Sequence, residues 1–144
     1  MTITVGIDSG STATKGILLE DGVIQRRFLC QTPFRPADAI VEAWETLRAG
    51  LSERPFLTLT GYGRQLVDFA DKQVTEISCH GFGARLLAPQ TRTVIDIGGQ
   101  DVKGISIDTD GTVKSFAMND KCAAGTGRFF EAMARSFAMC LPEF

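Results

Sequence analysis

The stretch Gly6-Ile7-Asp8-Ser9-Gly10-Ser11-Thr12-Ala13-Thr14-Lys15 decides the fold, because its pattern occurs twice in the chain. It links two short apolar runs through an acidic, glycine-rich turn, which is typical of a strand, a turn and a second strand. The stretch Ile95-Asp96-Ile97-Gly98, followed by Lys103-Gly104-Ile105, repeats it with the same seven-residue interval from aspartate to lysine. A repeat in register predicts two copies of one supersecondary unit.

Strands and helices are predicted in both copies, which indicates an α/β fold. In the first copy we expect strands at 3–7, 15–20, 23–31 and 55–60, and helices from Pro36, at 64–70 and at 77–88. In the second copy we expect strands at 93–97, 102–107 and 112–118 and a helix at 126–140. The second copy stops before a further strand and helix, so we expect a fragment of a longer natural protein.

A subdomain boundary is predicted near residue 90. The segment from Pro89 to Thr93 breaks the pattern of the preceding helix, and a new apolar run follows it. We therefore expect one complete subdomain at 1–90 and the start of its duplicate at 91–144.

The composition of the 144 residues limits the function classes. A net charge of −2, without a basic stripe, argues against a nucleic-acid partner. No apolar run approaches the roughly 20 residues that cross a bilayer, and the N-terminus lacks the regions of a signal peptide. We therefore expect a cytoplasmic protein without a membrane partner, whose four widely separated cysteines are reduced thiols.

The turn in each copy has the chemistry of a phosphate site. Glycine lets main-chain N–H groups approach phosphate oxygens. Ser11, Thr12 and Thr14 add hydroxyl donors, and Lys15 adds positive charge. An aspartate at the end of each first strand, Asp8 or Asp96, can hold a hydrated divalent cation. A single turn of this kind is more often structural, so the pair in register favours phosphate binding. Neither turn is a Walker A or GxGxxG sequence, which disfavours P-loop and Rossmann binding.

Several segments resemble a known family. The two loops are similar to the first and second phosphate motifs of the actin-like ATPase superfamily, which includes sugar kinases and heat-shock ATPases. Three further segments resemble the ATP-dependent activators of 2-hydroxyacyl-CoA dehydratases, relatives of benzoyl-CoA reductase ATPase subunits: Thr60-Gly61-Tyr62-Gly63-Arg64, Glu76-Ile77-Ser78-Cys79-His80 and Met118-Asn119-Asp120-Lys121-Cys122-Ala123-Ala124-Gly125-Thr126-Gly127-Arg128-Phe129. The resemblance covers nearly all of the chain. It implies a ribonuclease H-like α/β fold with a cleft between the two subdomains.

This resemblance implies an ATP-hydrolysing activator that delivers a low-potential electron to a 2-hydroxyacyl-CoA dehydratase-like partner. It implies a homodimer with one 4Fe-4S cluster shared between its subunits, an electron donor such as ferredoxin or flavodoxin, and ATP or ADP with Mg²⁺. Cys122 matches the first cluster cysteine, and the second cysteine and the adenosine motif would lie beyond Phe144. The positions that match the nucleotide site are Gly10, Ser11, Thr12, Ala13, Thr14, Lys15, Gly98, Gly99 and Gln100, with Asp8 and Asp96 binding Mg²⁺ through water.

Physical arguments bear on some of these residues separately. Cys122 precedes a glycine-containing turn at the start of the predicted last helix, where the helix dipole favours the thiolate that ligates iron. A lone cysteine is nevertheless more often inert. Cys79 and His80 are adjacent in the chain, and adjacent residues rarely bind one ion, so a packing role is favoured over metal binding. Gln100 has the chemistry to orient a water at the γ-phosphate. Glu76 is equally suited to polarise that water or to begin a helix.

Two other function classes stay open at this point. A small-molecule kinase of the same superfamily, for a sugar or a carboxylate, would need a catalytic aspartate facing an acceptor hydroxyl. A nucleotide-dependent scaffold protein would need neither an acceptor nor a cluster. Iron bound through Cys122 distinguishes the activator from both classes.

Overall fold

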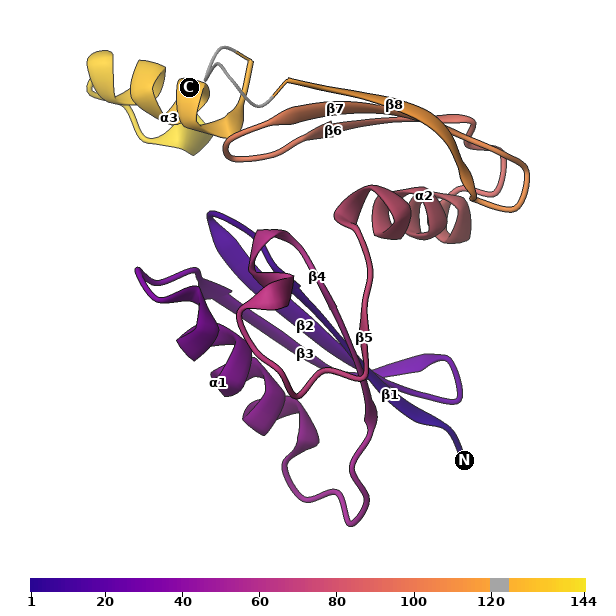
Figure 1. Ribbon diagram of the computed structural model, residues 1–144. Helices are drawn as coiled ribbons and strands as arrows, with labels where there is room; N and C mark the ends of the chain where they lie inside the picture. Colours follow the sequence, from indigo (N-terminus) through magenta and orange to yellow (C-terminus); the bar gives the residue numbers. More distant parts are fainter. Residues whose placement is uncertain (120–124) are drawn as a thin grey trace. The chain divides into compact units, whose positions relative to one another are not determined.

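The computed structural model describes residues 1–119 and 125–144 of the chain. The chain forms two compact units, Met1–Glu76 and Ile77–Phe144. This division falls after the first residue of the helix at Glu76–Leu87, whereas the boundary predicted near residue 90 follows the helix. Each unit contains one sheet and at least one helix, so the α/β class predicted from the sequence is confirmed (Figure 1).

The first unit is built on a five-stranded sheet with the order β3-β2-β1-β4-β5. Antiparallel pairing joins β1 to β2 and β2 to β3, and parallel pairing joins β1 to β4 and β4 to β5. The strands are β1 (Ile3–Ser9), β2 (Ala13–Glu20), β3 (Val23–Gln31), β4 (Phe56–Thr60) and β5 (Lys72–Gln73). The predicted meander and fourth strand are therefore present, and the parallel pairing places the ends of β1 and β4 side by side.

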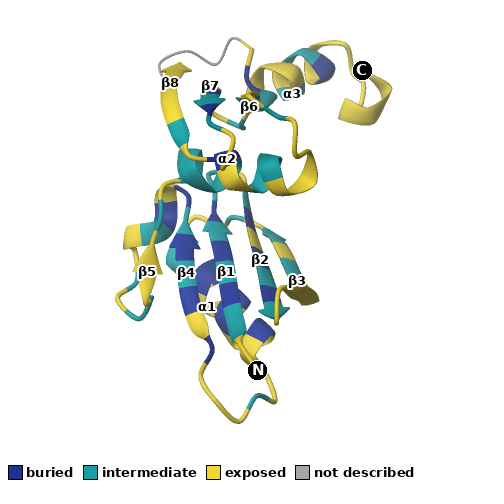
Figure 2. Ribbon diagram, turned by 90° about the vertical axis from the view of Figure 1, so that its right-hand side faces the viewer, coloured by how far each residue is buried: buried dark blue, intermediate teal, exposed yellow. Residues whose placement is uncertain are grey.

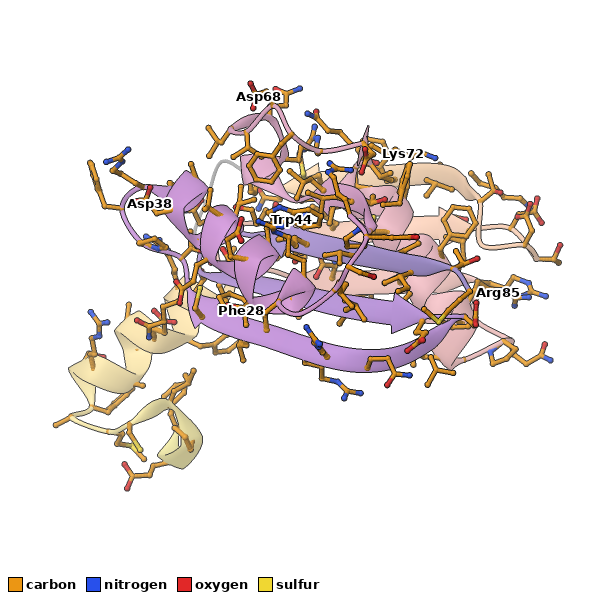
Figure 3. The ribbon with its side chains drawn as sticks, turned by 90° about the horizontal axis from the view of Figure 1, so that it is seen from below. Phe28, Asp38, Trp44, Asp68, Lys72 and Arg85 are labelled. Carbon is orange, nitrogen blue, oxygen red and sulfur yellow. The ribbon has the colours of Figure 1, made fainter. Side chains whose placement is uncertain are left out.

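Helix α1 (Pro36–Arg48) covers one face of this sheet. Proline suits the first turn of a helix, because the N–H that it lacks has no intrahelical partner there. Trp44 of α1 lies between the helix and the strands (Figure 3). The buried core consists of Val5, Ile7, Leu18, Ile40, Ala43, Trp44, Leu47, Leu57 and Leu59. The alternating buried residues of β1 and β4 show that one face of the sheet packs inward (Figure 2).

The segment between β4 and β5 differs from the sequence prediction. A short 3-10 helix, η1, spans Tyr62–Gln65, and the helix predicted at 64–70 is absent. The side chain of Asp71 holds this segment in place instead. Its carboxylate accepts hydrogen bonds from the Leu57 N–H at 2.7 Å and from the Arg54 guanidinium at 2.7 and 2.8 Å. These bonds hold the segment that precedes β5 against β4.

The same contacts make the stability of the first unit depend on pH. The Leu57 N–H, and then the Arg54 guanidinium, lower the pKa of Asp71 below its ordinary value of 3.8. A lowered pKa in the folded state stabilises the fold above the unfolded-state pKa, and this contribution is lost as the pH falls through the folded-state pKa. Asp71→Asn should therefore destabilise the unit at pH 7, and the difference from the unsubstituted chain should shrink below pH 4. Urea unfolding followed by Trp44 fluorescence at both pH values measures this. A difference independent of pH would contradict the prediction.

The second unit is built on a three-stranded antiparallel sheet with the order β6-β7-β8. Its strands are β6 (Thr93–Ile97), β7 (Val102–Ile107) and β8 (Val113–Asn119), and α2 (Glu76–Leu87) packs on one face. At the contact, a Cβ atom on Gly81 would lie 2.8 Å from the Gly111 carbonyl oxygen. This close approach requires glycine in α2.

The last helix is shorter than its predicted range of 126–140. Helix α3 spans Gly127–Ser136, and a 3-10 turn, η2, follows at Leu141–Glu143. Ala138, just beyond α3, has a positive φ of 53°, a conformation that ends a helix. In the described parts of the chain, no helix is long and apolar enough to cross a membrane.

Candidate functional site

The first loop brings Asp8 beside Lys15. The two residues are direct partners in the antiparallel register of β1 and β2, and Lys15 Nζ lies 3.1 Å from Asp8 Oδ2. The Lys15 side chain is 52% exposed. A surface ion pair of this kind is worth little in water. Lys15 can therefore turn from Asp8 toward an incoming anion at small cost.

Hydrogen bonds within the loop and from Thr32 fix the backbone of this loop. The Gly10 N–H donates to the Ala13 carbonyl oxygen at 3.2 Å. The Thr32 hydroxyl donates to the Gly10 carbonyl oxygen at 2.7 Å and lies 3.0 Å from the Thr14 hydroxyl. Residues 11–12 form the bend between these anchored positions. The loop is thus held in shape before any ligand binds, which reduces the entropy cost of binding.

A glycine-rich turn after β4 packs directly against the end of β1. Thr60 lies opposite Asp8 in the parallel register. Gly61 has a φ of 85°, and a Cβ atom there would lie 2.5 Å from Asp8 Oδ1 and from the Ser9 carbonyl oxygen. Sequence reasoning gave this turn no role in the site. The available signal was its Gly-x-Gly spacing directly after a strand, because ligands in α/β folds bind at the carboxyl ends of parallel strands.

Two buried hydroxyl groups lie at this edge of the first sheet. Ser9 Oγ and Thr60 Oγ1 are shielded from solvent and have no hydrogen-bond partner among the described residues. Buried polar groups are normally paired. The edge that carries Asp8 therefore fits a site that binds water or a polar ligand, such as hydrated Mg²⁺ with a phosphate group.

The second loop has the same register and different surroundings. Asp96 pairs with Lys103 across β6 and β7 as Asp8 pairs with Lys15. However, Lys103 is only 3% exposed, and its Nζ lies 2.6 Å from Asp101 Oδ2 and 3.4 Å from Asp96 Oδ2. The Gly98 N–H donates to the Asp101 carbonyl oxygen at 2.8 Å. Lys103 is thus held between two carboxylates as part of the structure of the loop.

Helix α2 adds a residue that sequence reasoning had treated as packing. His80 Nδ1 lies 3.0 Å from Asp96 Oδ2. The imidazole is 38% exposed, yet its Nδ1 atom is buried. No pattern in the sequence points from His80 to Asp96, because only the packing of α2 on the sheet brings them together.

The first turn of α3 is hydrogen bonded to the second loop. The N–H groups of Gly127 and Arg128 donate to the carbonyl oxygens of Gly98 and Gly99 at 2.9 and 3.2 Å. Thr126, which precedes the helix, is fully buried. The second loop and the first turn of α3 are therefore joined by main-chain hydrogen bonds.

The remaining predicted site residues lie as follows. Gln100 is exposed in the bend of the second loop, and Glu76 is half-buried at the start of α2. Cys122 lies outside the described residues. Within the described part of the chain, no three metal-binding side chains gather, and Cys30, Cys79 and Cys140 are free thiols.

The structure thus places the predicted residues in two local groups. The first unit holds Asp8 with residues 10–15, and the second unit holds Asp96 with residues 98–100. Their roles in nucleotide binding and hydrolysis remain predictions.

Comparison with known proteins decides the family. The model of the BadF/BadG/BcrA/BcrD ATPase family matches residues 5–144. The chain belongs to this family. Among its relatives, YjiL of Escherichia coli K12, described as uncharacterized, is 76% identical, and the match covers 99% of this chain and 56% of YjiL. The (R)-2-hydroxyglutaryl-CoA dehydratase activating ATPase of Acidaminococcus fermentans is 47% identical over 91% of this chain and 52% of its own length.

A solved relative gives the same family and fold. The activator of 2-hydroxyisocaproyl-CoA dehydratase from Clostridium difficile, with bound ADPNP, matches with a TM-score of 0.85 and 40% identity. The match covers 99% of this chain and 55% of the activator. The predicted resemblance to dehydratase activators and the predicted actin-like ATPase fold are confirmed. The chain spans about half the length of these relatives.

Proposed function

We propose that this chain is the nucleotide-binding part of a cytoplasmic, ATP-hydrolysing activator of a 2-hydroxyacyl-CoA dehydratase-like enzyme. The pair of aspartate–lysine loops in the same register carries this proposal. The activator from Clostridium difficile that binds ADPNP and the activating ATPase from Acidaminococcus fermentans support it.

The two loops divide the work of binding. In the first loop, the main chain of Gly10 to Thr14 contacts phosphate. The side chain of Lys15 also contacts phosphate, because it is half-exposed and pairs with a single carboxylate. In loop 2, the main chain of residues 98–100 contacts phosphate while Lys103 keeps the loop in shape. Asp8 and Asp96 bind Mg²⁺ through water, since Mg²⁺ prefers oxygen ligands and retains several waters.

Gln100 is the residue that we propose to orient the attacking water, and Glu76, at the start of α2, is a second candidate to polarise water. The exposure of Gln100 in the second loop supports this role, which resembles that of the glutamine in other nucleotide hydrolases.

Gln100→Ala should therefore slow single-turnover ATP hydrolysis on the order of 10²-fold, because a misplaced nucleophile costs about that much. ADP affinity should stay unchanged. The matched control is Gln90→Ala, an exposed glutamine of the same unit outside the loops. An unchanged hydrolysis rate in Gln100→Ala would remove Gln100 from the mechanism.

Electron delivery is the second half of the proposal. Cys122 is the cluster residue that we propose from this chain, in a homodimer that shares one 4Fe-4S cluster and receives its electron from ferredoxin or flavodoxin. The bonds from α3 to the Gly98 and Gly99 carbonyls support a link between nucleotide state and the segment before α3. Such a link requires two states that the nucleotide binds with different affinity.

Anaerobic purification of the full natural protein tests this half. We expect bound iron, a brown chromophore and loss of both in Cys122→Ser. A colourless, iron-free protein that still binds ATP would overturn electron delivery. ADP release that depends on an added sugar or carboxylate acceptor would instead favour a kinase.

A further inference from the structure

The two aspartates of the repeat have different neighbours. Asp8 contacts Lys15 of its own hairpin. Asp96 contacts Lys103 in the same way and also His80 of α2. Both of these ion pairs of Asp96 fall on Oδ2, and among the described residues no hydrogen bond or ion pair involves Oδ1. One carboxylate oxygen is thus paired with two side chains, and the other is paired with none in the described part of the chain.

Lys103 alone holds Asp96 weakly. Its contact with Asp101, at 2.6 Å, is shorter than its contact with Asp96, at 3.4 Å. In loop 1 the position equivalent to Asp101 is occupied by Ala13, five residues after the aspartate. Lys15 therefore pairs with Asp8 alone, whereas Lys103 is shared between Asp96 and Asp101. Asp96 has the imidazole of His80 as a second neighbour.

The position of His80 is fixed by backbone packing. The next residue, Gly81, lies so close to the sheet that a Cβ atom there would approach Gly111 at 2.8 Å and Ile107 at 3.1 Å. His80 Nδ1 is buried, and its 3.0 Å contact with Asp96 is not aligned as a full hydrogen bond. Hydrogen bonds of this kind are often loose in the free protein and tighten when the ligand binds.

We propose that His80 is a positioning residue for Asp96. Its Nδ1–H donates to Oδ2 and fixes the carboxylate so that Oδ1 accepts a water of the nucleotide-bound Mg²⁺. Residues that hold a metal-binding side chain in place commonly change metal affinity 10- to 100-fold when they are replaced. This inference rests on the proposed nucleotide function.

The test compares two variants of similar shape in the full chain, His80→Leu and His80→Asn. Asparagine keeps a donor near the position of Nδ1, whereas leucine does not. The readout is ADP affinity as a function of Mg²⁺ concentration, measured by calorimetry, with EDTA as the metal-free reference. His80→Leu should raise the Mg²⁺ concentration at half-maximal effect about 10- to 100-fold and leave metal-free ADP affinity unchanged. His80→Asn should lie closer to the unsubstituted chain.

The control is Leu86→Ala on the same helix, where the side chain is 83% exposed, and no change is expected. If the unsubstituted chain responds to Mg²⁺ and His80→Leu responds equally, the positioning role is overturned while the nucleotide site stands. Equal impairment of His80→Leu and His80→Asn would assign His80 to packing and also overturn the proposal. An unsubstituted chain whose ADP binding ignores Mg²⁺ would overturn the proposed metal site itself.

Discussion

Lys103→Met is expected to lower the free energy of unfolding of the second unit by about 3–5 kcal/mol. Lys103 and Asp101 are 3% and 4% exposed and lie 2.6 Å apart. Methionine fills much of the space of lysine but leaves Asp101 buried without that positive charge. Removal of one partner of a buried ion pair is costly because the other charge cannot regain water. Amide hydrogen exchange of β7 in the full chain measures the loss.

The repeat supplies the control for this prediction. Lys15 occupies the equivalent place in loop 1, but it is half-exposed and pairs with a half-exposed carboxylate. Lys15→Met should change the stability of the first unit by no more than about 1 kcal/mol, measured by Trp44 fluorescence in urea. Under the proposed function it should weaken ADP binding. Equal stability losses in the two variants would contradict the division between a structural and a ligand-binding lysine.

The hairpins of the two copies were predictable because their information is local. The seven-residue interval from aspartate to lysine, with glycine in the turn, determines that the two residues face each other across antiparallel strands. The predicted strands differ from the observed ones by at most two residues at either end. The two hairpin loops could therefore be placed from the sequence alone.

The residues that surround the two aspartates were not predictable, because their positions depend on tertiary packing. His80 reaches Asp96 through the packing of α2 on its sheet, and Gly61 reaches Asp8 through parallel pairing of β1 with β4. The burial of Lys103 depends on Asp101, which replaces Ala13 of the first copy. Spacing along the chain contains no signal for the contact between His80 and Asp96, and only the Gly-x-Gly pattern after β4 points to the turn at Gly61.

Ile7→Ala is expected to lower the free energy of unfolding of the first unit by about 2–5 kcal/mol, as in other truncations of buried aliphatic side chains. Ile7 is 1% exposed and lies in the core beneath α1. The neighbouring strand brings Gly16 so close to α1 that a Cβ atom there would lie 2.7 Å from Leu47 Cδ1. Such tight packing leaves little room for the core to close the cavity. Urea unfolding monitored by Trp44, the single tryptophan, reports this unit.

Ile95→Ala changes the equivalent residue of the second copy and should have a much smaller effect, within about 0.5 kcal/mol. Ile95 is 73% exposed, and in the described part of the chain no atom lies within 4 Å of a Cβ built on its cross-strand partner Gly104. The same motif thus places its isoleucine under a helix in one copy and on an open sheet face in the other. Hydrogen exchange of β6 and β7 measures the change. A loss as large as that of Ile7→Ala would mean that this face is covered in solution, because only a buried side chain can contribute so much.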